Sequence, residues 1–412
     1  MKKISKKLLI LLLLCFSIQI ISAQDYSEYM NAVEQKNAAY LAERYQIGIA
    51  EALTAAAGVF NDPNLSVEYG NNQDWSVQMG QSIEAGLSYE LSLGNVRRAR
   101  INVAQSEEDI TRAAIDDWFR NLKADATIAW VEAQEARSLM EVKQSSYESM
   151  QKVADSDSIR AALGDGSLID ARQSRIESRS LYADYLAAEA DYINALQTLS
   201  LYSGGMQFSE ISEEDIILSL PDYTAQELLD LALENRADLR AAELSRTLSE
   251  RNLALVKASR APEIELSAGY SYNTEVRNEI APAPIFHGLT GGVAAPLKFS
   301  RLNKGERIAA ERAVQQANAA YEAAQQQIVM EVQQALVSWQ SAKKVAQKCS
   351  NTMLEDAASI LESRRTAYLQ GDSSLLDYLM SVRVYNETAE QCIAAKAGLT
   401  TAAAELLRAI GL

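Results

Sequence analysis

One stretch of this sequence occurs twice. Residues 164–170 read GDGSLID and residues 371–377 read GDSSLLD, an offset of 207 positions (371 minus 164). The same offset, without a gap, carries Gly204 near the end of the first copy onto Gly411 near the end of the second. A repeat of this size is one structural unit built twice. In both copies the glycine-containing break interrupts a long, alanine-rich helical pattern, which predicts two antiparallel helices joined by a tight turn.

The N-terminus has the pattern of an export signal. Four lysines in the first seven residues precede an apolar run, residues 8–21, that is too short to cross a membrane as a helix. We expect residues 1–23 to be a signal peptide that is cut near Ala23. Cys15 invites a lipoprotein interpretation, but Leu14 stands where a lipidation signal requires a small residue, so we favour a signal peptide without lipidation.

The exported chain is acidic and has a helix-forming composition. Removing the four signal lysines leaves 35 of 39 basic side chains against 55 acidic ones, a formal charge of about −20. Such a charge repels nucleic acid, so we expect no nucleic-acid partner. Only 6 prolines and 18 glycines occur in 412 residues, 48% of which are apolar, and this favours a mainly helical fold.

Each repeat carries a pair of extended segments. Helical patterns over residues 26–60 and 224–258 come first, and Thr224 is the expected N-cap of the second. Two extended segments then follow in each repeat, and the first of them alternates apolar with polar side chains over residues 63–70, as a strand with two different faces must. These segments are residues 63–70, 77–93, 262–270 and 285–299.

A long helix follows each strand pair, at residues 96–160 and 302–368, and is longer than a globular domain needs. Apolar residues, many of them small, recur along the first helix at alternating gaps of four and three and along the second at gaps of three or four, which is the heptad seam of a coiled coil. The first seam is Ile115, Phe119, Leu122, Ala126, Ala129, Ala133, Ala136 and Met140. The second is Val314, Ala317, Tyr321, Ala324, Ile328, Val332, Ala335, Trp339, Ala342 and Ala346.

The order helix, strand, strand, long helix, tip, return helix therefore occurs twice. We expect the first repeat at residues 24–205, with its return helix at residues 167–202. A polar linker follows at residues 206–223, and the second repeat covers residues 224–412.

The four strands carry aromatic residues near their ends, as membrane strands do at the two bilayer interfaces. These residues are Tyr69, Trp75, Tyr89, Tyr270, Tyr272, Phe286 and Phe299. Four strands cannot close a membrane barrel, because lipid tolerates no open sheet edge and closure takes at least about eight strands. We therefore predict a mainly α protomer with a membrane β-hairpin pair, assembled as a trimeric 12-stranded β-barrel on a long periplasmic α-helical barrel. The alternative is a small soluble sheet.

Several motifs support this arrangement: ALENRADLRAAE at residues 232–243, APEI at residues 261–264, Pro296-Leu297, and YLQG at residues 368–371. With the repeat itself, these resemble the TolC family, the outer-membrane exit ducts of tripartite efflux pumps and type I secretion systems. The resemblance covers essentially the whole mature chain.

A weaker resemblance points to the heavy-metal efflux branch of that family, the CzcC and CusC ducts. It lies in ELSLGNVRRARI at residues 90–101 and LKFSRLNKGE at residues 297–306. Asn95 and Val96 depart from the glycine and lysine of that branch. The substrate therefore stays open between metal ions, drugs and proteins.

The family resemblance implies a passive channel in the outer membrane of a diderm bacterium, extending into the periplasm. It implies a homotrimer in contact with outer-membrane lipid. Its partners would be a periplasmic adaptor (a membrane fusion protein) and an inner-membrane pump of the RND type, which does the energetic work.

The resemblance also implies roles for the two hairpin tips. The residues implied to contact the adaptor are Gly164, Ser167, Leu168, Gly371, Ser374 and Leu375. Asp170 and Asp377 match acidic residues that line the closed periplasmic entrance, and Tyr368 matches a tyrosine of the gating network. The alternative is that both aspartates only stabilise the first turn of a return helix. The second aspartate is followed three places later by Met380, where the family also has a charge, which favours a more weakly held gate.

Two cysteines of the exported chain could pair, because disulfides persist outside the cytoplasm. Cys349 lies 22 residues before Gly371 and Cys392 lies 21 residues after it, so an antiparallel hairpin brings both to the same height. Packed helix axes are about 8 to 10 Å apart, whereas a disulfide needs Cα atoms within roughly 4.4 to 6.8 Å. Two buried thiols are the alternative.

The sequence has no recognisable catalytic or cofactor chemistry. His287 is the only histidine, so a metal site built from several imidazoles is excluded, and we expect it in a surface loop. No phosphate-binding loop with its lysine occurs. We expect no enzyme activity, no cofactor and no metal. Two other classes remain: an envelope coiled-coil scaffold or adhesin without transport activity, and, less favoured because adaptors have one helical hairpin rather than two, a periplasmic adaptor.

Overall fold

The computed structural model describes residues 25–72, 78–212, 223–297, 303–349 and 351–412. The expected signal peptide, Trp75, Phe299 and most of the linker lie outside these residues. The described chain divides into two compact units. Unit 1 lies within residues 25–42, 117–236 and 327–412, and unit 2 within residues 43–116 and 237–326.

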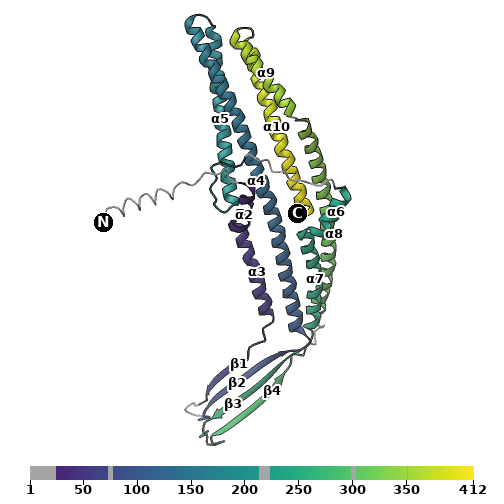
Figure 1. Cartoon of the computed structure of the whole chain (residues 1–412). Helices are drawn as coiled ribbons and strands as arrows, with labels where there is room; N and C mark the ends of the chain where they lie inside the picture. Colours follow the sequence, from purple (N-terminus) through teal and green to yellow (C-terminus); the bar gives the residue numbers. More distant parts are fainter. Residues whose placement is uncertain (1–24, 73–77, 213–222, 298–302, 350) are drawn as a thin grey trace, which may run out of the picture. The chain divides into compact units, whose positions relative to one another are not determined.

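Unit 2 contains one sheet of four antiparallel strands in the order β1, β2, β3, β4 (Figure 1). The strands are β1 Asn64–Asn71, β2 Gln81–Ser92, β3 Glu263–Asn273 and β4 Phe286–Ala294. All four coincide with the predicted extended segments. Pairing of β2 with β3 joins the two predicted hairpins. Within this sheet β1 and β4 each pair on one side only, so both edges are open.

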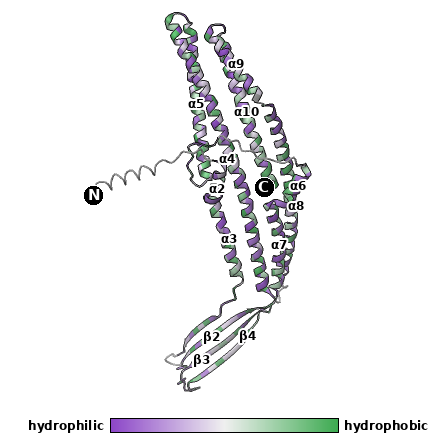
Figure 2. Cartoon of the chain, in the orientation of Figure 1, coloured by the Kyte–Doolittle hydropathy of each residue, from purple (hydrophilic) through white to green (hydrophobic). Residues whose placement is uncertain are grey.

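The two faces of this sheet differ in chemistry, because apolar and polar residues alternate along β1, β2 and β3 (Figure 2). Strand β4 is less regular, since His287 lies on the apolar face and Phe286 and Ala294 lie on the other. Residues that share a face follow from the strand register. One face carries Leu65, Val67, Tyr69, Ile83, Ala85, Leu87, Tyr89, Leu266, Ala268, Tyr270, Tyr272, Leu289 and Val293. The other carries Ser66, Glu68, Ser82, Glu84, Gly86, Ser88, Glu90, Glu265, Ser267, Gly269, Ser271, Thr290 and Gly292. The sheet is therefore suited to two different environments.

Helices make up most of the rest of the described chain. They are α2 Tyr26–Lys36, α3 Ala38–Ala57, α4 Val96–Leu163, α5 Leu168–Tyr202, α6 Ala225–Asn235, α7 Ala237–Ala258, α8 Lys304–Lys348, α9 Asn351–Gln370 and α10 Leu375–Ile410. As predicted, α4 is long and uninterrupted, with 68 residues. Thr224 caps α6 in a full capping box with Glu227, also as predicted. None of the described helices is both long and apolar enough to cross a membrane.

Three predicted helices are each interrupted once, so the prediction of continuous helices there is wrong. The first breaks at Asn37, between α2 and α3, and the third breaks between Lys348 and Asn351. The second breaks at Arg236, between α6 and α7. Periodicity missed these breaks because no proline or glycine marks any of them.

The seam of α4 is buried where it passes through unit 1. Leu122, Ala126, Ala129 and Ala133 pack against α2 and α5, around the fully buried Trp130. Small residues let the helices approach closely, as the heptad pattern predicts. The seam of α8 behaves differently, because only Ile328 and Val332 are buried in a single chain.

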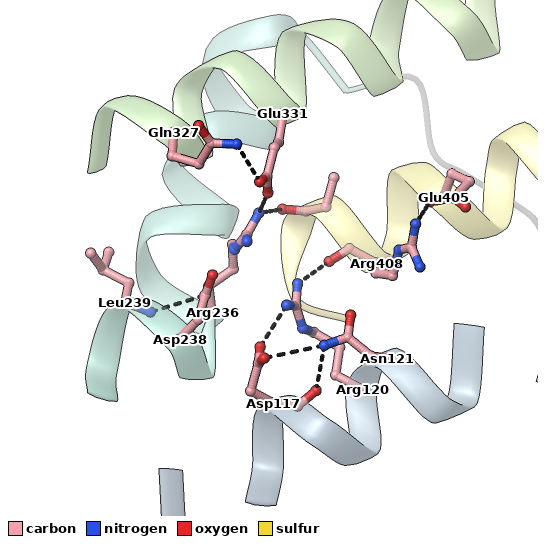
Figure 3. A network of polar contacts seen from close by, with 11 residues as sticks. Asp117, Arg120, Asn121, Arg236, Asp238, Leu239, Gln327, Glu331, Glu405 and Arg408 are labelled. Carbon is pink, nitrogen blue, oxygen red and sulfur yellow. Dashed lines mark hydrogen bonds and ion pairs between the residues drawn. The ribbon is translucent and has the colours of Figure 1, made fainter. Parts of the chain in front are cut away.

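In both repeats, a polar side chain at the helix break bonds to the end of the return helix. The Asn37 side chain at the first break donates a hydrogen bond from Nδ2 to the carbonyl oxygen of Tyr202, at 2.9 Å. At the second break, Arg236 donates from Nη1 to the carbonyl oxygen of Ala409, at 3.3 Å (Figure 3). Each acceptor lies near the end of a return helix, where the last carbonyls have no partner within the helix.

Two arginines donate hydrogen bonds to backbone carbonyl oxygens at the end of α10. Arg236 has a side chain only 4% exposed and pairs with Glu331, with Nη1 to Oε2 at 2.5 Å. Arg120 donates from Nη1 to the carbonyl oxygen of Arg408, at 2.5 Å, and its other amino group bonds to Asp117 (Figure 3). Arg236 belongs to the ALENRADLRAAE motif, so this part of the motif has a structural role in unit 1.

Each return helix is followed by a glycine that lies against the helix break of the same repeat. Gly204 and Gly411 have φ of +72° and +86°, in the left-handed region that favours glycine. A Cβ on Gly204 would lie 2.1 Å from the carbonyl oxygen of Lys36, and one on Gly411 would lie 3.0 Å from the backbone nitrogen of Arg236. Close backbone contact at these two points therefore requires glycine.

We predict that Gly204→Ala lowers the melting temperature of the purified protein by more than Gly205→Ala. Both glycines have positive φ, so each substitution costs about 1–2 kcal/mol of backbone strain. Only at residue 204 does the added methyl group also collide with the Lys36 carbonyl, since nothing lies within 4 Å of a Cβ at residue 205. Equal losses for the two variants, measured by circular dichroism on heating, would contradict the close contact.

Candidate functional site at the hairpin tips

The two predicted tips are tight turns between antiparallel helices of unit 1 (Figure 1). In the first, Gly164 has φ of +79°, and the Ser167 hydroxyl accepts hydrogen bonds from the backbone nitrogens of Ile169 and Asp170. In the second, Gly371 has φ of +86° and Ser374 caps α10. The predicted hairpins are therefore confirmed.

The tip leucines lie in different environments. Leu168 is 66% exposed, whereas Leu375 is 5% exposed and packs in a cluster with Tyr368. The other expected contact residues, Gly164, Ser167, Gly371 and Ser374, are exposed. A partner that approaches the tips would therefore meet Leu168 but not Leu375 in this arrangement.

Tyr368 is buried between the two hairpins. Its hydroxyl donates a hydrogen bond to Asp157 Oδ1 at 2.9 Å, and both side chains are buried. Its ring lies parallel to that of Tyr378, with centroids 6.0 Å apart. The surrounding cluster contains Met150, Val153, Leu181, Leu375 and Val382. A residue of α9 therefore ties the second hairpin to α4 of the first.

Burial keeps these two tyrosines neutral at pH values where an exposed tyrosine would ionise. Burial, followed by the hydrogen bond to Asp157, raises the pKa of Tyr368 well above its usual value. Burial is the main cause that raises the pKa of Tyr378 to about 12. The Tyr368 hydroxyl thus keeps its proton and donates a hydrogen bond to Asp157 Oδ1.

The two aspartates that repeat each other have different surroundings. Asp170 is half-buried and lines a cavity of about 160 Å³ together with Asp157, Arg160, Tyr368 and the two tip turns. Asp377 is exposed, and its carboxylate accepts a hydrogen bond from the Ser374 hydroxyl at 2.8 Å. That bond, with the Ser374 backbone nitrogen, holds the pKa of Asp377 below its usual range.

Asp157 and Arg160 complete the site, and sequence analysis missed both. A comparison of the two repeats contains the signal. At the offset of 207, Asp157 corresponds to Arg364, and Tyr368 corresponds to Ala161. The two repeats therefore carry different residues at both positions that form the hydrogen bond between the hairpins. For this reason the bond forms once and is not repeated.

No group of three or more metal-binding side chains occurs among the described residues. His287 lies within β4 rather than in a loop, where its ring contacts Tyr270 and Tyr272. Its Nδ1 lies 2.5 Å from the Tyr270 hydroxyl. Cys349 and Cys392 are free thiols in unit 1.

The fold is that of known outer-membrane channels. The structure of CusC shares 17% identity over 93% of this chain and 91% of its own, with a TM-score of 0.74. The Campylobacter jejuni CmeC channel gives 14% identity over 93% and 85%, with a TM-score of 0.77. The open state of the Neisseria gonorrhoeae MtrE channel gives 18% identity over 93% and 88%, with a TM-score of 0.75. No curated protein sequence gives a significant match.

The second repeat matches a family model directly. Residues 228–412 match the family described as outer membrane efflux protein. This match and the fold of the whole chain confirm the predicted TolC-like resemblance. Residues 228–412 therefore match the outer membrane efflux protein family, and the chain as a whole has the fold of outer-membrane channels.

We predict that Tyr368→Phe loosens the contact between the hairpins. The change leaves the buried Asp157 carboxylate without its donor, which costs about 1–3 kcal/mol. Because 1.4 kcal/mol corresponds to a tenfold change in an equilibrium, the open fraction of single channels should rise roughly tenfold in planar bilayers.

Tyr378→Phe is the matched control. Tyr378 is also buried in the same cluster, but its hydroxyl has no hydrogen-bond partner among the described residues. Its removal should leave the open fraction unchanged. Equal effects of the two substitutions would contradict a specific role for the Tyr368 hydroxyl.

Proposed function

We propose that three copies of this chain form one exit duct of a tripartite efflux pump. In this proposal the sheets of three copies close a 12-stranded barrel in the outer membrane, and the helices form a tube in the periplasm. An adaptor docks at the tips, and an inner-membrane pump of the RND type drives transport. The cargo, whether metal ions, drugs or protein, is selected by the pump, because a wide water-filled duct selects little.

The two-faced sheet is the observation that carries this proposal. Its apolar face suits lipid, and its opposite face of serine, glycine and glutamate suits water. Both sheet edges expose unpaired backbone groups, which lipid does not tolerate. Closure by strands of further copies removes those edges, and three copies reach a strand number that a barrel allows.

Apolar residues on the helices support the same assembly. Tyr45, Ile49 and Leu53 recur every four residues on α3 and are more than half exposed. On α8, Met330, Val337 and Val345 recur at close to heptad spacing and are also exposed. Exposed apolar stripes of this kind mark helix–helix interfaces, so neighbouring copies would cover them.

The first test of this proposal is the oligomeric state. We predict that the protein is found in the outer-membrane fraction as a trimer that dissociates on heating. Sedimentation in detergent should give three times the mass of one chain. A monomer under these conditions would contradict the shared barrel, and a trimer that conducts no ions in bilayers would favour the scaffold or adhesin alternative.

We further propose that Asp170 and Asp377 face the axis of the closed entrance. Three copies would bring six carboxylates together, which attracts cations. The hydrogen bonds with Ser374 lower the pKa of Asp377, so its carboxylate stays charged into more acidic solution than an ordinary aspartate. The Ser374 hydrogen bond supports the alternative role in capping α10 equally well, so the two roles need a direct test.

We predict that Asp377→Ala abolishes block of the channel by divalent cations, whereas Ser374→Ala preserves it. The first substitution removes the charge and the second removes the hydroxyl that caps α10 but leaves the charge. Single-channel recordings with added divalent cations would measure both. Matching effects of the two substitutions would show that Asp377 acts only through the helix cap.

A further inference from the structure

Two thiols lie together in unit 1. Cys349 follows the last residue of α8, Lys348, and α9 begins at Asn351. Its sulfur approaches α10, with Sγ 3.9 Å from the carbonyl oxygen of Gln391. Gln391 immediately precedes Cys392 in α10, and burial and the neighbouring Cys349 thiol raise the pKa of Cys392. Cys392 is only 4% exposed, whereas Cys349 is half-buried.

The break between α8 and α9 removes the obstacle to a disulfide that continuous helices would present. Packed helix axes stay about 8 to 10 Å apart, which holds Cα atoms on neighbouring helices too far apart in most positions. Cys349 is the first residue after α8, and its backbone nitrogen still bonds to the carbonyl oxygen of Val345 at 3.1 Å, so the thiol lies where the helix ends rather than within it. Cys349 Sγ approaches the α10 backbone at the residue before Cys392, which brings the two cysteines close together.

We propose that Cys349 and Cys392 are an oxidative modification site that forms an intramolecular disulfide after export. The proposal rests on the location outside the cytoplasm given above, where disulfides form and persist. The structure shows the reduced form of this site.

The oxidant is a protein disulfide of the periplasm. The Cys349 thiolate attacks one sulfur of that disulfide, which forms a mixed disulfide and releases one thiolate of the oxidant. The Cys392 thiolate then attacks Cys349 Sγ and displaces the second thiolate. Two protons and two electrons leave the cysteines, and the oxidant is reduced to a dithiol. Cys349 attacks first because it is the more exposed thiol, while burial raises the pKa of Cys392.

The bond encloses the part of the chain that carries the second tip. Tyr368, Gly371, Ser374 and Asp377 all lie between the two cysteines in sequence. A disulfide there would hold the start of α9 against α10. It would lie farther from the tip along the hairpin than the hydrogen bond from Tyr368 to Asp157. The redox state of the pair would therefore set how far the second hairpin can open at its base.

The test measures the thiols in the full-length protein made by cells. Whole cells are quenched in acid, and the protein is captured, unfolded and alkylated with iodoacetamide, with and without prior reduction. We expect no cysteine of residues 24–412 to be labelled in the unreduced sample and both to be labelled after reduction. Labelling of both thiols without reductant would overturn the proposal.

Two variants make the result specific. Cys392→Ser should leave Cys349 as a thiol that is labelled without reductant. Reductant should lower the melting temperature of the wild-type trimer but not that of a variant that carries both Cys349→Ser and Cys392→Ser. An equal shift in both proteins would overturn the structural role of the bond.

Failure of the disulfide proposal can be distinguished from failure of the proposed duct function. Acid quenching records the thiol state wherever the protein lies in the cell, and fractionation records the location independently. Free thiols in a protein that is trimeric and outer-membrane bound would reject only the disulfide. A bonded pair in a periplasmic protein that is not in the outer membrane would reject only the duct.

Discussion

Backbone contact at the ends of the two repeats is the constraint on which unit 1 depends. In each repeat the return helix ends at a glycine that touches the break in the first helix, and a buried polar side chain at that break bonds to the helix end. Asn37 and Arg236 are equivalent in position but not in chemistry. An amide satisfies one carbonyl, whereas the larger guanidinium also reaches Glu331. A buried cation needs such a partner, because removing it leaves an uncompensated charge.

Differences between the repeats matter as much as their identity. The turn, its serine cap and the following aspartate are kept in both copies, since every helical hairpin needs a closed turn. The hydrogen bond between hairpins needs a donor on one copy and an acceptor on the other. Tyr368 and Asp157 occupy positions that hold Ala161 and Arg364 in the opposite copies. This asymmetry of sequence therefore gives the two tips different surroundings in the structure.

The sequence predicted the strands, the long helix α4, both tips and the Thr224 cap, because each has a local signal in spacing or turn chemistry. It did not predict the breaks at Asn37 and Arg236, which depend on a helix end about 170 residues away rather than on local propensity. Asp157 was missed for a similar reason. An aspartate on a long acidic helix is indistinguishable from a solvated one until the chain brings Tyr368 beside it, 211 residues later.

A single copy leaves its most apolar surfaces without partners. The seam of α8 is buried at only two positions, the stripes on α3 and α8 face outward, and one sheet face is apolar across all four strands. At roughly 25 cal/mol per Å² of apolar surface removed from water, covering them is a large driving force. The sheet edges and the helical stripes lie on the same chain. Pairing of the sheet edges between copies would therefore also raise the local concentration of the helical stripes. Under the proposed assembly, closure of the sheet and packing of the helices are therefore expected to be coupled, because neither surface is covered in the separate chain.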